Sequence, residues 1–189
     1  MSVKTFYFDE ASSSHTSKVL SLVREYLKDN QAIKHVVVAT TKGATGIAAA
    51  EEFSDKKVVV VSHQSGFAMP NENELSEEDR GKIEKFGATV LTATHAFGGV
   101  ARSFRKELST WVPTEIVALA LKTFGQGTKV CAEIAMMAAD AGLIPVTEDV
   151  VCIAGTGRGA DTAWIVRPAY SHAFPKIRMK ACICKPLNF

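Results

Sequence analysis

Residues 36–39, Val-Val-Val-Ala, form an unbroken apolar run, and this run constrains the fold more than any other stretch of the chain. A strand that alternates apolar and polar residues can face water on one side, whereas an unbroken apolar strand is buried on both faces, as in parallel sheets. Further core strands are predicted at 57–61, 89–92 and 148–154. Segments with helical spacing of apolar residues, such as 15–28, lie between them. This alternation predicts an α/β fold with a largely parallel sheet.

The remaining elements follow from shorter signals. Outer strands are predicted at 4–8, 162–166 and 177–184, and the strand-turn-strand pattern at the C-terminal end predicts an antiparallel edge to the mostly parallel mixed sheet. The other helices are expected at 47–53, 76–87, 100–108, 113–125 and 128–141. Because no repeat, low-complexity stretch or linker interrupts the pattern, we expect one domain over residues 1–189.

The apolar run at 36–39 ends in hydroxyl groups, a lysine and two glycines, where a helix is expected to begin. The first N–H groups of a helix have no partner within it and carry partial positive charge. Such a helix start suits a phosphate. An ordinary strand-to-helix turn with a threonine cap is the alternative. The candidate phosphate-binding residues are Thr40, Thr41, Lys42, Gly43, Ala44, Thr45 and Gly46.

A second glycine loop, residues 155–160, matches the spacing G-x-G-x-x-A of dinucleotide-binding loops. That motif requires a helix directly afterwards and an acidic residue about twenty positions on. A strand is predicted here instead, so we reject dinucleotide binding. Gly157, Arg158 and Gly159 remain as a flexible loop with one cation whose planar fork of donors suits phosphate. Pairing of Arg158 with Asp161 in a plain hairpin is equally compatible with the residues.

Four polar or glycine-rich loops follow predicted strands. They comprise residues 40–45, 62–67, 94–99 and 155–161. Ligands of open α/β sheets bind beyond the carboxyl ends of the strands. We therefore expect Lys42, His63, His95 and Arg158 to meet at one edge of the sheet. Gly66 and Phe67, in the second of these loops, belong to the same candidate site.

His63 and His95 are the candidate general acids or bases, because histidine titrates near neutral pH. No set of nucleophile, base and orienting group is readable, so a role as hydrogen-bonding loop residues is the stronger interpretation. Lys129 and Glu133 lie one turn apart on an otherwise apolar helix. They face either the pocket or the solvent, and the flexible stem of lysine favours the solvent.

Composition and charge limit the classes of partner and the cellular location that we expect. The net charge is +2 and the basic residues are scattered, so nucleic acid is not an expected partner. No apolar run reaches the length of a membrane span, and the first residues lack a signal-peptide pattern, so we expect a cytoplasmic protein without a membrane partner. Four cysteines within apolar stretches are expected to be free buried thiols, with Cys182 and Cys184 on one face of a strand. They lack the second ligand pair of a metal site, so no metal is expected.

Two stretches, 35–61 and 149–168, resemble the C-terminal α/β domain of pyruvate kinase, in the stand-alone form found in archaea and some bacteria. Residues 129–134, 137–140 and 158–163 are similar to signatures of the stand-alone family. The resemblance implies a three-layer α/β/α sandwich with a mixed sheet. It also implies a phosphate site at residues 40–45, since in the full enzyme the two glycine loops hold a sugar-phosphate effector. Flavin mononucleotide (FMN) is a ligand associated with the stand-alone family.

Pyruvate kinase catalyses its reaction on a TIM barrel with metal-binding carboxylates, for which this chain has no room. We therefore expect no pyruvate kinase activity. Our first hypothesis is a binding module for a phosphorylated small molecule, with FMN the leading candidate and Phe67 and Phe97 as the wall for its ring. The second is an enzyme that acts on a phosphorylated metabolite, or a flavin-dependent oxidoreductase, using His63 or His95. The third is an assembly role as a homo-oligomer.

Overall fold

Seven strands form one sheet in the order β1-β7-β6-β5-β2-β3-β4 in the computed structural model, which describes residues 4–189. The strands are β1 (Phe6–Glu10), β2 (His35–Ala39), β3 (Lys57–Ser62), β4 (Thr89–Thr92), β5 (Val150–Ala154), β6 (Thr162–Arg167) and β7 (Arg178–Asn188). β6 runs antiparallel to its neighbours β5 and β7, and every other pair is parallel. This confirms the predicted mixed sheet, mostly parallel with antiparallel pairing toward one edge.

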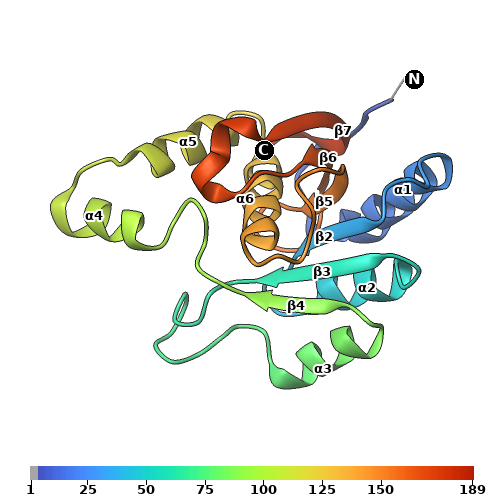
Figure 1. The fold of residues 1–189 in the computed structure, drawn as a ribbon, viewed down its shortest axis with the longest axis horizontal. Coiled ribbons are helices and arrows are strands. Elements are labelled where there is room, and N and C mark those ends of the chain that lie inside the picture. The colour runs from blue at the N-terminus through green and yellow to red at the C-terminus, as the bar shows by residue number, and fades with distance from the viewer. Residues whose placement is uncertain (1–3) are drawn as a thin grey trace.

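Helices cover both faces of the sheet, so the molecule has the three layers that were predicted (Figure 1). The helices are α1 (Thr16–Asp29), α2 (Ala44–Glu52), α3 (Glu77–Lys85), α4 (Val100–Leu108), α5 (Pro113–Lys122) and α6 (Gln126–Asp140), with short 3-10 helices η1 (Ser13–His15) and η2 (Ser171–Lys176). α1, α2 and α3 pack on one face, and α6 packs on the other. α5 packs against α6 on the side away from the sheet.

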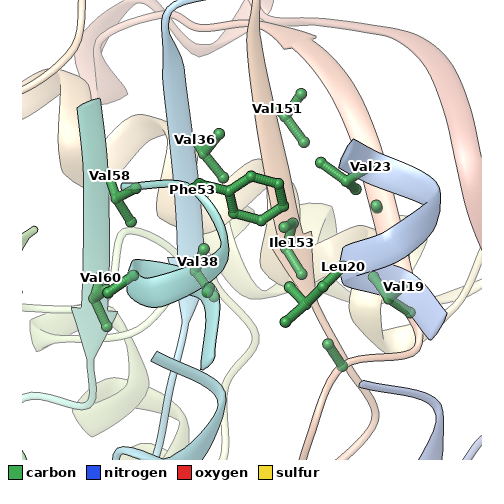
Figure 2. Packing of buried hydrophobic residues seen from close by; sticks show 14 of the residues in the cluster. Val19, Leu20, Val23, Val36, Val38, Phe53, Val58, Val60, Val151 and Ile153 are labelled. Atoms are coloured by element: carbon green, nitrogen blue, oxygen red, sulfur yellow. The ribbon is translucent and has the colours of Figure 1, made fainter. Parts of the chain in front are cut away.

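The first core layer explains why the central strands are apolar at every position. Phe53, which follows α2, is fully buried between this helix layer and the sheet. Its ring lies near Val36 of β2, Ile153 of β5 and Val23 of α1 (Figure 2). The alternate residues of the same strands, such as Val37, pack against α6 on the opposite face. Both faces of β2 are therefore buried, as the unbroken apolar run predicts.

The four cysteines are free thiols, and three of them are buried. The prediction that Cys182 and Cys184 share one face of a strand is wrong. Cys184 lies opposite Ala163 and Cys182 lies opposite Trp164, because the pairing of β6 with β7 shifts register at this point. A register shift of this kind turns neighbouring side chains to different faces. Burial raises the pKa of both thiols to about 12.

α4 stands apart from the layers, at the left margin of Figure 1, and buries none of its residues. It begins after Gly99, whose φ is 59°, and ends at Ser109, whose φ is 52°. Both values lie in the left-handed region that turns the chain sharply. Among the described residues, none of the helices is both long enough and apolar enough to cross a membrane.

Candidate functional site

A cavity of about 510 Å³ lies beyond the carboxyl ends of the central strands. Its volume is in the range of small-molecule sites. The loops after β2, β3, β4 and β5 all contribute to its wall, so the four predicted loops do converge at one edge of the sheet. The sequence-predicted residues that line it are Thr40, Thr41, Lys42, Ala44, Thr45, His63, Phe67, His95, Gly157, Arg158 and Gly159. Gly43, Gly46 and Gly66 are not part of the lining.

Thr40 and the two glycines of the first loop shape the start of α2. The Thr40 Oγ1 accepts hydrogen bonds from the N–H groups of Gly43 and Gly46, at 3.2 and 3.3 Å. Gly43 has a φ of 104°, and a Cβ at Gly46 would lie 2.7 Å from the Val60 Cγ1. The N-cap residue of α2 is Gly43, which has no side chain, so the Thr40 hydroxyl three residues earlier accepts a first-turn N–H instead. The two glycines provide the turn and the close packing.

The same loop also presents unpaired donors to the cavity. Among residues 4–189, the N–H groups of Thr41, Lys42, Ala44 and Thr45 have no hydrogen-bond acceptor. These four residues line the cavity. The loop therefore combines a closed turn with free donors: the Thr40 hydroxyl closes the turn, and the residues that carry the unpaired N–H groups lie in the cavity wall.

The second glycine loop is closed from within by Asp161. This fully buried carboxylate accepts hydrogen bonds from the Thr156 N–H at 2.9 Å and from the Thr162 hydroxyl at 2.6 Å. The Ala160 N–H donates to the Thr16 Oγ1 at 2.9 Å, which anchors the loop to the start of α1. Asp161 is thus engaged without Arg158, whose exposed side chain forms no ion pair within residues 4–189. The alternative interpretation, a plain hairpin in which Arg158 pairs with Asp161, is therefore wrong.

The cavity wall is strongly cationic. Its lysines and arginines are Lys42, Arg102, Lys122, Lys129 and Arg158, whereas Glu133 is the one carboxylate in the lining. Lys129 is paired with Glu133, and the other four have no carboxylate within 4.0 Å among the residues that the structure describes. The Nε of Arg102 is also buried without a hydrogen-bond partner. Unpaired cations around a concave wall create a local positive potential that favours an anionic ligand.

An aromatic cluster of His63, Phe67 and His95 forms another part of the wall. The ring of His63 lies 4.2 Å from that of Phe67 and 5.3 Å from that of His95, between ring centroids. The guanidinium of Arg102 lies 5.8 Å from the centre of the Phe67 ring. These groups offer a stacking surface for a planar ring.

Two carboxylates influence the histidines of this cluster differently. The Nδ1 of His63 lies 2.5 Å from the Glu74 Oε2, which fixes the orientation of the imidazole. Burial lowers the pKa of His95 to about 4, although Glu133 opposes the shift. His95 is therefore a neutral ring at pH 7, able to accept or donate a hydrogen bond but unable to supply a positive charge.

Lys129 and Glu133 face the cavity, so the expectation that they extend into solvent is wrong. They are 7% and 5% exposed, and the Lys129 Nζ donates to the Glu133 Oε2. The Glu133 Oε1 accepts a hydrogen bond from the Phe97 N–H at 3.0 Å. The reason is the position of α6, which is enclosed by the sheet on one side and α5 on the other. Lys129 and Glu133 lie in the enclosed part of this helix, where the cavity is the space open to them.

Phe97 does not form the predicted wall for a ligand ring. It is 4% exposed, does not line the cavity, and packs against Phe174 with ring centroids 5.8 Å apart. The apolar wall comes instead from Val61 of β3 and from residues of α6 at helical spacing. The α6 residues are Val130, Ile134 and Met137. That spacing in the sequence indicates only a buried helix, so these lining residues were not predicted.

The polar lining residues missed by the sequence interpretation are Arg102, Lys122 and Gln126, on or beside helices rather than in loops after strands. Nothing in their local sequence marks them, because only the folding of α4, α5 and α6 brings them to the cavity. Glu74 was missed as well, since it lies eleven residues beyond the histidine that it contacts. Within residues 4–189, no group of three or more His, Cys, Asp or Glu side chains is arranged to hold a metal ion.

Comparison with known proteins gives one family. The model of the family described as "Pyruvate kinase, alpha/beta domain" matches residues 17–166 of this 189-residue chain. The matched region contains both glycine loops and every lining residue of the cavity.

Solved structures that are similar to the chain are distant. A hydrogen sulfide-producing enzyme from Fusobacterium nucleatum is 18% identical, with 61% of this chain and 43% of that chain covered and a TM-score of 0.32. O-ureido-L-serine synthase is 17% identical, with 70% of this chain and 49% of that chain covered and a TM-score of 0.31. Each match spans less than half of the solved chain. Likeness at this level carries no information about the site.

Proposed function

The chain belongs to the pyruvate kinase α/β domain family, and we propose that it binds a phosphorylated small molecule in the cavity at the carboxyl ends of its strands, with FMN as the leading candidate. One observation carries this proposal. Unpaired N–H groups at the start of α2 and four cations without carboxylate partners face the same cavity. This combination recurs where proteins bind phosphate.

The phosphate would bind at residues 41–45, with the ammonium of Lys42 and the guanidinium of Arg158 as counter-charges. Both cations line the cavity and neither is engaged by a carboxylate. A phosphate there would accept hydrogen bonds from the outward N–H groups and interact with the positive end of α2. Thr41 and Thr45 add hydroxyl donors on the same side.

The ring system of FMN would occupy the other part of the cavity. His63, Phe67 and His95 supply aromatic faces, and Val130, Ile134 and Met137 supply an apolar wall. A ligand with a phosphate at one end and a large planar ring at the other matches this division into a cationic and an aromatic part. FMN has both features, which is why we rank it above a simple sugar phosphate.

The double variant Lys42→Ala with Thr45→Ala tests the phosphate site. We expect it to lose retention of FMN, measured by the visible absorbance and mass spectrum of the purified protein, while its circular dichroism and thermal transition stay unchanged. Lys85→Ala removes an exposed lysine on α3, outside the cavity lining, and is the matched control. Retention of FMN by the folded double variant would contradict the proposed phosphate position.

We expect no pyruvate kinase activity, because the family match concerns the α/β domain. A second candidate function is catalysis on a phosphorylated metabolite or by a bound flavin, and it is favoured by the contact between His63 and Glu74. A carboxylate that holds an imidazole in place is the usual arrangement for a general base.

Flavin chemistry separates the binding module from a flavin-dependent oxidoreductase. FMN-loaded protein is mixed with NADH or NADPH under anaerobic conditions, and the loss of flavin absorbance is followed before and after an electron acceptor is added. Repeated reduction and reoxidation that is slowed in Glu74→Gln would support an oxidoreductase. Reduction by light alone, without turnover by either nucleotide, would contradict a flavin-dependent oxidoreductase.

A further inference from the structure

Lys129 is the single lysine or arginine among residues 4–189 that is buried, and it lines the cavity. Long cationic side chains are rarely buried unless they are paired or functional. Its pairing with Glu133 gives the ammonium one acceptor. An ammonium group has three protons to donate, so two of them have no hydrogen-bond acceptor within the described part of the chain, although the Nζ also lies 5.6 Å from the centre of the Phe97 ring.

The surroundings of Lys129 make its ammonium easier to deprotonate than that of an exposed lysine. Burial lowers the pKa of its ammonium, and the nearby charges of Lys122 and Arg102 lower it further. Glu133 acts in the opposite direction and keeps a carboxylate beside the Nζ. Desolvation and neighbouring cations are the two devices by which proteins turn a lysine into a nucleophile. The adjacent carboxylate is placed to accept the proton that such a lysine must release.

We propose that the amine of Lys129 forms a covalent imine with the carbonyl carbon of a phosphorylated aldehyde or ketone bound in this cavity. The inference rests on the proposed phosphate site at residues 41–45, but not on FMN as its occupant. The phosphate loop and Lys129 line one cavity of about 510 Å³, which gives a small phosphorylated carbonyl compound access to both.

The step balances with the groups that are present. Glu133 accepts one proton from the ammonium of Lys129, and the nitrogen lone pair then attacks the carbonyl carbon. The carbon–nitrogen bond forms as the carbonyl π bond breaks, and the oxygen takes up the proton returned by Glu133. The hydroxyl group leaves as water with the second proton of the nitrogen. The product is a protonated imine, in which the nitrogen keeps the third proton and the positive charge, and no oxidant or reductant is consumed.

Reductive trapping tests the proposal on the unmodified protein. Glyceraldehyde 3-phosphate is added with cyanoborohydride at neutral pH, and peptide mass spectrometry locates the reduced adducts. We expect one adduct per chain on Lys129, formed about tenfold faster than on an exposed lysine such as Lys85. Lys129→Arg should lack this adduct, and Glu133→Gln should slow its formation. Adducts spread over exposed lysines, with Lys129 unmodified, would overturn the proposal.

A comparison with unphosphorylated glyceraldehyde tests the imine at Lys129 separately from the proposed phosphate site. We expect it to label Lys129 more slowly than the phosphorylated compound, and the Lys42→Ala, Thr45→Ala double variant should remove the difference. Equal labelling of the unmodified protein by both compounds would overturn the phosphate site and uphold the reactive amine. Binding of glyceraldehyde 3-phosphate by calorimetry without any Lys129 adduct would overturn the imine and uphold the phosphate site.

Discussion

His95 demonstrates how burial decides what a titratable residue can do. In sequence, it is a loop histidine suited to proton transfer near neutral pH. In the structure, burial lowers its pKa from 6.5 to about 4, against the influence of Glu133. A neutral His95 beside Phe67 is part of a stacking surface, with ring centroids 5.1 Å apart. The proposed role of His95 in binding an uncharged ring therefore rests on its surroundings rather than on its residue type.

Stability should fall as the pH drops from 6.5 to about 4, because within this window unfolded His95 binds a proton that the folded protein excludes. Above pH 6.5 the ring is neutral in both states and this contribution to stability is fully present. His95→Gln should flatten the decline by less than about 1 kcal/mol per pH unit, since solvent reaches part of the ring. Urea unfolding of both proteins across this range measures the difference. Parallel pH profiles would show that His95 is not responsible.

Two glycines within helices, Gly46 and Gly81, differ in how much space each leaves for a larger side chain. Gly46 lies in α2 and Gly81 lies in α3. A Cβ at Gly46 would meet Val60 Cγ1 at 2.7 Å and Ile83 Cδ1 at 3.0 Å, because α2 packs closely between β3 and α3. A Cβ at Gly81 would have no heavy atom within 4 Å. Helix propensity favours alanine at both positions, and packing opposes it at only one.

Gly81→Ala should therefore stabilise the protein by about 0.5–1 kcal/mol, which is the gain in helix propensity. Gly46→Ala should destabilise it by about 1–3 kcal/mol, because overpacking outweighs the same gain. Chemical denaturation measures both changes, and each variant is the control for the other. Equal stability of the two variants would mean that α2 moves away from β3 without cost.

The cavity is a property of the whole molecule. Its wall includes Thr40 from the first half of the chain, Lys129 from α6 and Gly159 from the loop after β5. A ligand that contacts all three parts stabilises the folded state as a unit, because the unfolded chain offers no such site.

Assembly into a homo-oligomer is also a property of the whole molecule. It stays a prediction, which sedimentation velocity of the purified protein would test.

FMN at one hundred times its dissociation constant should stabilise the protein by about 2.7 kcal/mol. For a chain of this length, that corresponds to a rise of about 5–10 °C in the thermal midpoint. Differential scanning calorimetry with and without FMN measures the shift. The Lys42→Ala, Thr45→Ala double variant should show no rise, and Lys85→Ala should show all of it. A rise of the same size in the double variant would mean that FMN binds elsewhere.

The local sequence was sufficient to predict the elements and the edge of the sheet at which the site lies. The apolar runs predicted β2, β3 and β5, and their downstream loops met as expected because parallel strands end on the same side. The resemblance of residues 149–168 to the pyruvate kinase α/β domain predicted that the second glycine loop lies beside the first. The fold of that family is confirmed. These features depend on periodicity and chain direction, which short segments already contain.

Tertiary structure decided what the sequence left open. Lys129 and Glu133 turned into the cavity because α5 and the sheet enclose α6. Phe97 was buried in the core against Phe174, and Cys182 changed face because β6 and β7 shift register. In each case the direction of a side chain depended on a packing partner distant in sequence. Periodicity along a single segment determines which residues share a face, whereas the element packed against that face determines whether they contact solvent, core or ligand.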